Sequence, residues 1–184
     1  MELVEIKEED ERMLRRHKEF RRAAEYVAEE FARAPEVLKI ALFGSVAKPL
    51  PREVPRFREF RRAGIAIYHE CKDVDIAVWL ENLDCLNSLQ KARGQALNRL
   101  FQAEDVGVAH HQVDVFIFEP TTNRYLGRLC HFKACPNDKP ECRVPRCGEN
   151  QFLRQHEDFV LDPAAVSAAH AVTLYERRTP QGFV

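Results

Sequence analysis

The segment from Lys72 to Leu80 places two acids, Asp73 and Asp75, at the start of an otherwise apolar run. We interpret this run as a strand. Side chains alternate along a strand, so residues two apart project from the same face and both carboxylates point the same way. Two like charges side by side are unfavourable unless a cation bridges them. Mg²⁺ is a suitable cation, because it prefers oxygen and is usually held by one or two carboxylates plus substrate phosphates.

A second informative segment lies upstream, where a short apolar run over 38–43 ends in Gly44-Ser45. This pattern predicts a buried strand that closes in a tight turn. Glycine at such a turn lets a ligand approach the backbone. The serine hydroxyl and the nearby amides can then meet phosphate oxygens.

A third segment lies downstream, where one acid, Asp114, interrupts the strongly β-prone stretch 112–120. Asp114 shares a strand face with Phe116 and Phe118, which we expect to face a core. A carboxylate on that face needs a partner, and a metal ion between strands would supply one.

The ordered set of Gly44-Ser45, Asp73-Val74-Asp75 and then Asp114 resembles the DNA polymerase beta-like nucleotidyltransferase superfamily. The resemblance is closest to its minimal members, including antitoxin-type proteins, and to the aminoglycoside nucleotidyltransferases. It covers roughly residues 36–120, which is most of a small catalytic domain. It implies the family's fold, a mixed sheet with helices packed against it. It also implies the family's reaction, transfer of a nucleoside monophosphate from an NTP.

The resemblance also implies roles for the individual residues. Asp73 and Asp75 would bind the Mg²⁺ ions that hold the triphosphate. Asp114 would complete the second metal site and help to deprotonate the attacking hydroxyl. Gly44 and Ser45 would contact the triphosphate. The alternative interpretation is structural: Asp73 caps a turn, Asp75 pairs with an arginine and Asp114 is a strand-end acid.

The chain departs from the minimal family members in one interval, because 27 residues separate Ser45 from Asp73. This insertion, residues 46–72, contains prolines that argue against a long helix directly after Ser45. It is also more basic than acidic. Two interpretations stay open, a lid or acceptor-docking loop that holds an anionic partner and a solvated surface insertion. A short strand is expected over 64–69.

Four of the six cysteines fall in one turn-rich stretch, as Cys130, Cys135, Cys142 and Cys147. Four thiolates brought together by turns match a tetrahedral structural Zn²⁺ site. Such a site has no open position, so its role would be to fold a segment too short to bury a core alone. Disulfides, unligated thiols and an iron–sulfur cluster are the alternatives.

The cellular compartment of the protein indicates whether the four cysteines bind a metal or form disulfides. The chain starts with an acidic and basic stretch and lacks an apolar signal segment, so we expect a cytoplasmic protein without membrane contact. Reduced cysteines in that compartment favour metal binding. Of the two remaining cysteines, Cys71 is expected to fill space beside the sheet rather than to react, and Cys85 to open a helix as part of the core.

The expected fold class is α/β (α+β), a mixed β-sheet flanked by helices with the nucleotidyltransferase fold and a small zinc-stabilised C-terminal element. The core would span 1–125, and a zinc-binding region with a C-terminal helix would span 126–184 and pack on the core.

Three helices are expected within this fold. Amphipathic patterns predict helices over 8–34 and 84–102, and Asp162-Pro163 predicts the cap of a closing helix near 163–175. Residues 151–161 are expected to be extended. The predicted core positions of the first two helices are Met13, Phe20, Ala24, Val27, Phe31, Leu86, Leu89, Leu97 and Leu100.

Together these patterns predict a Mg²⁺-dependent nucleotidyltransferase that moves AMP, or another NMP, to a hydroxyl on a protein, an RNA or a small molecule. Lys and Arg total 28 against 29 Asp and Glu, which argues against a general nucleic-acid binder. The expected partners are an NTP and an acceptor, with a helical protein or a second copy of the chain completing the acceptor site. The alternative is a regulatory module, antitoxin-like, that binds a nucleotide or a partner without efficient chemistry.

Overall fold

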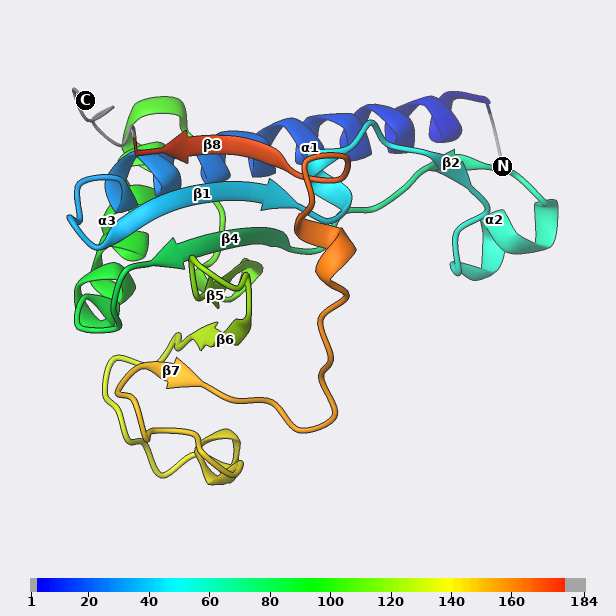
Figure 1. The fold of residues 1–184 in the computed structure, drawn as a ribbon. Coiled ribbons are helices and arrows are strands. Elements are labelled where there is room, and N and C mark those ends of the chain that lie inside the picture. Colours follow the sequence, from blue (N-terminus) through cyan, green and yellow to red (C-terminus); the bar gives the residue numbers. More distant parts are fainter. Residues whose placement is uncertain (1–2, 178–184) are drawn as a thin grey trace.

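The centre of the computed structural model, which describes residues 3–177, is a six-stranded mixed sheet (Figure 1). Across the sheet the strand order is β7–β6–β5–β4–β1–β8. The strands are β1 (Val37–Phe43), β4 (Val74–Leu80), β5 (Val113–Phe118), β6 (Tyr125–Leu129), β7 (Leu153–Arg154) and β8 (Val172–Glu176). β4 and β5 are parallel, and the other neighbours are antiparallel. The expected α+β class with a mixed sheet is therefore confirmed.

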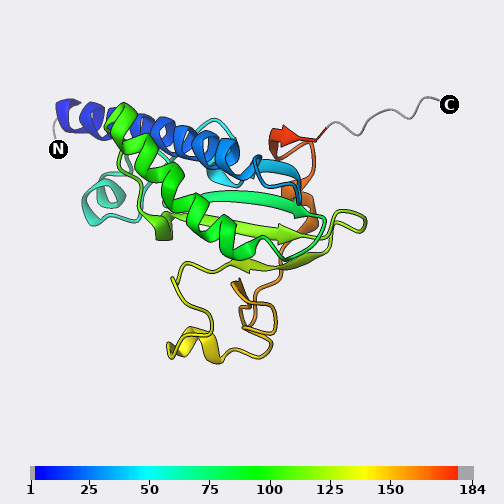
Figure 2. The same ribbon diagram turned by 90° about the vertical axis from the view of Figure 1, so that its left-hand side faces the viewer.

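Two long helices, α1 (Leu3–Phe31) and α3 (Leu86–Glu104), lie on the same face of this sheet (Figure 2). All the apolar positions predicted on both helices are buried. Most of them join one core with the strand residues that face the helices, such as Ile76, Val78 and Val115. No helix within residues 3–177 combines the length and the apolar character needed to cross a lipid bilayer.

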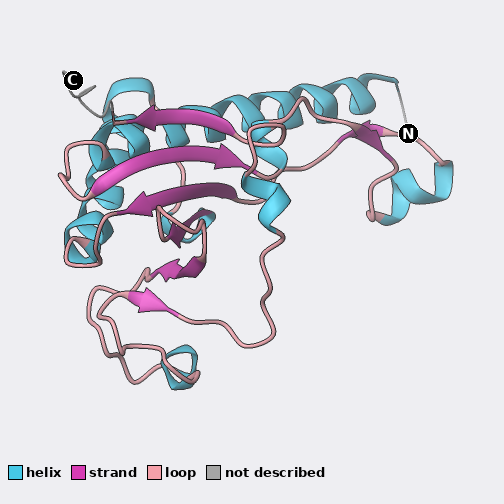
Figure 3. Ribbon diagram, viewed as in Figure 1, coloured by secondary structure: helices cyan, strands magenta, loops and turns pink. Residues whose placement is uncertain are grey.

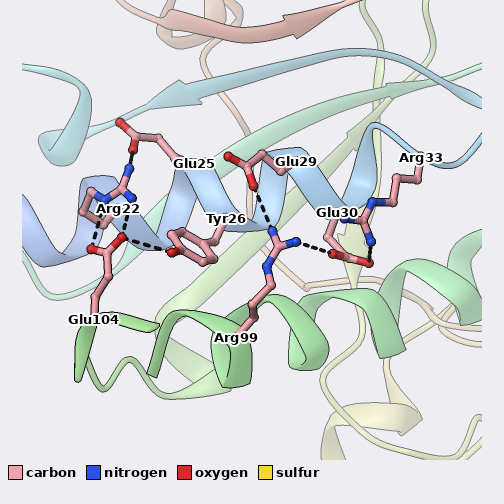
Figure 4. A network of polar contacts seen from close by, with 8 residues as sticks. All are labelled: Arg22, Glu25, Tyr26, Glu29, Glu30, Arg33, Arg99 and Glu104. Carbon is pink, nitrogen blue, oxygen red and sulfur yellow. Dashed lines mark hydrogen bonds and ion pairs between the residues drawn. The ribbon is translucent and has the colours of Figure 1, made fainter. Parts of the chain in front are cut away.

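Charged side chains connect the outer surfaces of α1 and α3 (Figure 4). Arg22 on α1 pairs with Glu104 on α3, and Arg99 on α3 pairs with Glu29 at 2.9 Å and with Glu30 at 3.4 Å. Exposed pairs of this kind contribute about 0–1 kcal/mol each. The apolar contacts beneath them therefore supply most of the stability of the helix pair.

The opposite face of the sheet carries a second, smaller apolar cluster. It is made of Ala41, Phe43, Ala77, Trp79, Phe116 and Phe118. Side chains from 159–171 cover part of it. Because strand side chains alternate, Asp75 and Asp114 belong to this face and not to the helical one.

The insertion after Ser45 forms a small unit beside the main sheet (Figure 1). A short 3₁₀ turn, Ser45–Ala47, replaces the long helix that the prolines argue against. β2 (Arg52–Glu53) and β3 (Ile67–Tyr68) pair antiparallel, and α2 (Arg58–Ala63) lies between them in sequence. The short strand expected over 64–69 is therefore present, but outside the main sheet.

The predicted closing helix over 163–175 is wrong. Asp162 does cap a turn, because its carboxylate accepts a hydrogen bond from the Ala164 amide at 2.9 Å. The turn is only a 3₁₀ segment, Pro163–Val166, and the chain then extends as β8 beside β1. The free edge of β1 offers backbone partners to the β-branched Val172 and Thr173, which outweighs the local helix signal.

The stretch between β6 and β7 is mostly turns, with one 3₁₀ segment over Pro140–Arg143 (Figure 3). The expectation of an extended 151–161 is wrong beyond β7, because that part consists of turns and irregular chain. The predicted boundary at 125/126 falls inside β6, and β7 joins the main sheet. Residues 1–2 and 178–184 of the predicted ranges lie outside the described residues.

We expect the helix pair to depend on its buried face rather than on its ion pairs. Phe31→Ala should lower the free energy of unfolding by about 3–5 kcal/mol, because it empties a buried aromatic site. Glu104→Ala should lower it far less, because the ion pair of Glu104 with Arg22 is open to solvent. Urea unfolding followed by circular dichroism measures both. An equal loss of unfolding free energy in the two variants would contradict the view that the buried face, and not the ion pairs, stabilises the helix pair.

Candidate functional site

The β4–β5 pairing brings together two of the three predicted carboxylates. The parallel register sets Asp75 opposite Asp114, so their side chains leave the sheet at the same level and on the same face. Asp73 lies just before β4 at the same end, and its pKa responds to the charge of Asp114. The structure therefore places all three acids at one end of the sheet, with Asp75 and Asp114 on the face that α1 and α3 leave free.

Gly44 lies directly against Asp75. The antiparallel β1–β4 register pairs Phe43 with Asp75, so the turn that follows β1 meets this carboxylate. A Cβ atom at position 44 would overlap with Oδ2 of Asp75, and Gly44 has a φ of 74°. Glycine is therefore required both by the backbone conformation and by the close approach of the acid.

Ser45 follows in the same turn and lines the same pocket as Asp73 and Asp75. Its side chain is a hydrogen-bond partner of the Cys71 thiol. Cys71 is buried, and burial raises the pKa of its thiol, so it stays protonated near neutral pH. Cys71 thus fills space and positions Ser45, which agrees with the prediction that it is not reactive.

Crowding of negative charge perturbs the acids. Burial, together with the charges of Asp114 and Asp73, raises the pKa of Asp75 from 3.8 to about 6, and the charge of Arg128 opposes this rise. Burial and the charge of Asp114 also raise the pKa of Asp73. Within residues 3–177, Asp75 accepts no hydrogen bond that would relieve this repulsion. A bound cation would relieve it and lower both pKa values.

Arg128 on β6 is a member of the site that the sequence did not indicate. Its Nη1 donates to Oδ2 of Asp114 at 2.7 Å, and the two side chains are only 18% and 17% exposed. The guanidinium carbon lies 4.4 Å from the ring centre of Phe116 and 4.6 Å from that of Phe159. Arg128 therefore engages one oxygen of Asp114 and leaves the other free.

A pocket of about 510 Å³ opens beside the acids, between the end of the sheet, α1 and the insertion. Its volume is in the range of small-molecule sites. Ser45, Asp73 and Asp75 line one side, and the insertion supplies Arg56 and the half-exposed Phe57. The other lining residues are Met13, Glu53, Pro55, Ile67, Tyr68, His69, Glu70 and Lys72.

The insertion is attached to α1 and so forms a wall of this pocket. The buried Asp10 accepts the Tyr68 amide at 2.9 Å and pairs with Arg52 through its other oxygen. His69 and Glu53, on the two strands of the insertion or next to them, lie 2.8 Å apart. These contacts fix the position of the insertion beside the acids, and its role stays a prediction.

The donor set at the acids suits Mg²⁺, because it consists of carboxylate oxygens on a rigid strand pair. Gly44 leaves room beside Asp75 that any other residue would fill. Within the described part of the chain, no three His, Cys, Asp or Glu side chains are close enough together to hold a metal ion as they stand.

The four clustered cysteines are all free thiols, which excludes disulfides among them in this structure. Cys130 is buried, and its pKa is raised by burial and by nearby Cys135 and Cys142. The amide of Phe132 donates to Sγ of Cys130 at 3.4 Å, an interaction that favours a thiolate. Cys135 and Cys142 therefore lie near Cys130, although the thiols are not arranged as a metal site in the described residues. Thiolates are donors that suit zinc.

Comparisons with known proteins identify no relative: no family model, curated protein or solved structure matches this chain. The function must therefore be argued from the geometry and chemistry of the site.

The raised pKa of Asp75 makes a prediction about stability. The folded state binds this proton more tightly than the unfolded state, so Asp75 destabilises the fold as pH rises from about 4 to about 6. Without divalent metal, Asp75→Asn should stabilise the protein at pH 7.5 by on the order of 2 kcal/mol. The gain should vanish below pH 4. Urea unfolding between pH 4 and 8 measures it.

Asp84→Asn is the matched control, because Asp84 is exposed and lies outside the site. A stabilisation of Asp75→Asn that is the same at pH 4 and pH 7.5 would show that carboxylate crowding is not its cause.

Proposed function

We propose that this chain is a Mg²⁺-dependent nucleotidyltransferase of the DNA polymerase beta-like type, which transfers an NMP, in the simplest case AMP, from an NTP to a hydroxyl. One observation carries the proposal. Asp75 and Asp114 are in register on parallel strands, with Gly44 against Asp75, beside a pocket of nucleotide size. Adjacent carboxylates with perturbed pKa values, such as Asp75 beside Asp114, are typical of sites that bind divalent metal.

Each residue has a role in this proposal. Asp73 and Asp75 hold Mg²⁺ with the triphosphate, and Asp114 contributes its oxygen that Arg128 leaves free. The bound ions supply charge neutralisation for the reacting phosphates. The hydroxyl of Ser45 and the exposed backbone at Gly44 meet the terminal phosphate oxygens.

The reaction is an in-line displacement at the α-phosphorus. The acceptor oxygen forms a bond to this phosphorus, the bond to the bridging oxygen of the β-phosphate breaks, and pyrophosphate leaves. Asp114 accepts the proton of the acceptor hydroxyl. Positioning and charge stabilisation supply the rate enhancement, and no covalent enzyme intermediate is needed.

The insertion supplies the part of the site that meets the nucleoside. Phe57 is 49% exposed although it lines the pocket, which leaves its ring accessible to a base. Stacking of a base on an aromatic ring tolerates any base. Arg56 and Lys72, also in the lining, complement phosphate charge.

A second candidate function is a nucleotide-binding regulatory module. The ion pair between Arg128 and Asp114 favours it, because it already neutralises the acid that the reaction needs as a base. The same pocket would then bind a nucleotide without turnover.

We also propose that the stretch between β6 and β7 holds one structural Zn²⁺ through Cys130, Cys135, Cys142 and Cys147. The support is the spacing of the four cysteines in a turn-rich stretch, the influence of Cys135 and Cys142 on Cys130, and the Phe132 amide that donates to Sγ of Cys130. This stretch consists of turns, so a metal ion would supply the cohesion that a small core cannot.

Label transfer tests the enzyme. The purified full chain with Mg²⁺, an α-³²P-labelled NTP and cell extract should label an acceptor, whereas γ-labelled NTP should not. Asp75→Asn should reduce transfer by at least about a hundredfold, the scale expected for loss of a charge-stabilising group. Asp84→Asn should retain the activity of the original chain.

Nucleotide binding without label transfer from any of the four NTPs would favour the regulatory module. Transfer of the γ-label would show that the chain transfers a phosphoryl group and not a nucleotidyl group.

Metal content and hydrogen exchange test the zinc site. We expect about one zinc per chain by elemental analysis, in line with a single four-thiolate site. Its removal by a chelator should speed exchange over 128–150 and leave β4 and β5 unchanged. Cys142→Ser should lose the zinc, while Cys85→Ala should keep it because Cys85 lies in the main core. Unchanged exchange over 128–150 after removal would rule out a structural role.

A further inference from the structure

A second group of charged side chains lies on the other side of Asp114 from Asp75. The registers place Arg128 on β6 opposite Phe116 on β5, and Arg154 on β7 opposite Arg128. Both arginines therefore share the sheet face of Asp114. Two histidines complete the group, which we call the Arg128–Arg154 cluster: His131 after β6 and His156 after β7.

The members of this cluster are close enough to influence one another. Arg154 lies 2.9 Å from Nε2 of His131 through its Nη1. Burial, together with the charges of Arg128 and Arg154, lowers the pKa of His156 to about 4. The His156 ring is therefore neutral at pH 7.

Positive charge exceeds negative charge around Asp114. Arg93 on α3 is fully buried, and its hydrogen bonds go to the carbonyls of Cys130 at 3.0 Å and Val113 at 3.4 Å. Within residues 3–177, neither Arg93 nor Arg154 has a carboxylate in ion-pair range, and Asp114 pairs only with Arg128. Arg128 and Arg154 are half-buried and bring two positive charges to one carboxylate, so an anion would balance the excess.

Unpartnered hydrogen-bond donors gather at the same place. Among the described residues, six buried side-chain nitrogens lack a hydrogen-bond partner, and four of them belong to the Arg128–Arg154 cluster. These four are Nε of Arg128 and Arg154 and Nδ1 of His131 and His156, and the other two are Nε of Arg93 and Arg99. Arginine only donates, so Nε2 of His131 accepts and Nδ1 carries the proton. Clustered buried donors of this kind indicate a missing acceptor-rich ligand.

We propose that the Arg128–Arg154 cluster binds the phosphate group of the acceptor, a phosphate monoester that also carries the attacking hydroxyl. This inference rests on the proposed nucleotidyl transfer. The triphosphate occupies the pocket beside Asp73 and Asp75, and in-line attack brings the acceptor from the side opposite the leaving pyrophosphate. Asp114 lies between the pocket and the cluster, so the acceptor hydroxyl meets Asp114 when its phosphate meets Arg128 and Arg154.

Histidine NMR of the full chain with its metal tests the anion site directly. Inorganic phosphate and ribose 5-phosphate should shift the side-chain signals of His131 and His156 in a saturable way, whereas ribose should not. The exposed His170 is the internal control and should stay unchanged. Arg154→Gln should weaken phosphate binding at least about tenfold, because it removes a charged donor. Arg124→Gln, an exposed arginine paired with Glu119, should bind as before.

Three results would overturn the inference. The first is the absence of shifts at 10 mM phosphate, or equal shifts at His170. The second is loss of bound zinc in Arg154→Gln, because the arginine would then be a counterion of the cysteine site. The third is displacement of phosphate by α,β-methylene-ATP without an acceptor, because the cluster would then bind the nucleotide itself.

A transfer assay separates this inference from the proposed function. Transfer that prefers ribose 5-phosphate to ribose at least tenfold, with the preference lost in Arg154→Gln and kept in Arg124→Gln, supports both. Transfer abolished by Asp75→Asn but indifferent to the acceptor phosphate overturns the acceptor assignment and leaves the function standing. Saturable histidine shifts without transfer from any NTP overturn the function and support the anion site.

Discussion

The parallel pairing of β4 with β5 is the constraint on which the rest of the structure depends. A parallel pair needs a crossover, and α3 supplies it by packing on one face of the sheet. The residues that face α3 and α1 form the main core, so side chains of the other parity must project from the opposite face. Asp75 and Asp114 are of that parity. The same packing that stabilises the fold therefore holds two acids next to each other on the free face.

The charges on that face are ordered along the sheet. Acids lie on β4 and β5, and arginines lie on β6 and β7, with the pair of Arg128 and Asp114 where the two groups meet. Each group is costly on its own, since Asp75 has a raised pKa and Arg154 has no carboxylate partner within the described chain. Of these acids only Asp114 pairs with an arginine, Arg128, so Arg154 keeps an uncompensated charge within the described chain. This separation is what binding to a cation and an anion at adjacent places requires.

The sequence predicted the acidic part of the site because its signal is local. Asp73 and Asp75 share one strand, Gly44 follows another, and Asp114 interrupts a third, so strand periodicity alone indicates their faces. The basic part depends on pairing between β5, β6 and β7, which no local pattern encodes. Arg154 looks like any surface arginine until β7 joins the sheet. Asp10 was missed for the same reason, because its partners lie in the distant insertion.

The error at the C-terminus has a related cause. Asp162 and Pro163 form a sound local helix start, and the turn they predict is present. The unpaired edge of β1 is a tertiary feature, and it turns the following residues into β8. The positions of α1 and α3 were predictable because apolar residues recur along each segment with the helical period, and these residues are buried in the structure.

The insertion supplies a second wall of the pocket beside the acids. Asp10 on α1 binds the Tyr68 amide and Arg52, so the two-stranded unit is held against the helix and not left in solvent. That attachment brings Arg56 and Phe57 over the acids of β4. The 27 residues between Ser45 and Asp73 thereby form a wall of the pocket. The insertion lies on the pocket side of Asp114, whereas Arg128 and Arg154 lie on its opposite side. The two sides of the acids therefore differ in chemistry. A substrate with two ends, a nucleotide and an anionic acceptor, matches this asymmetry better than a single ligand does.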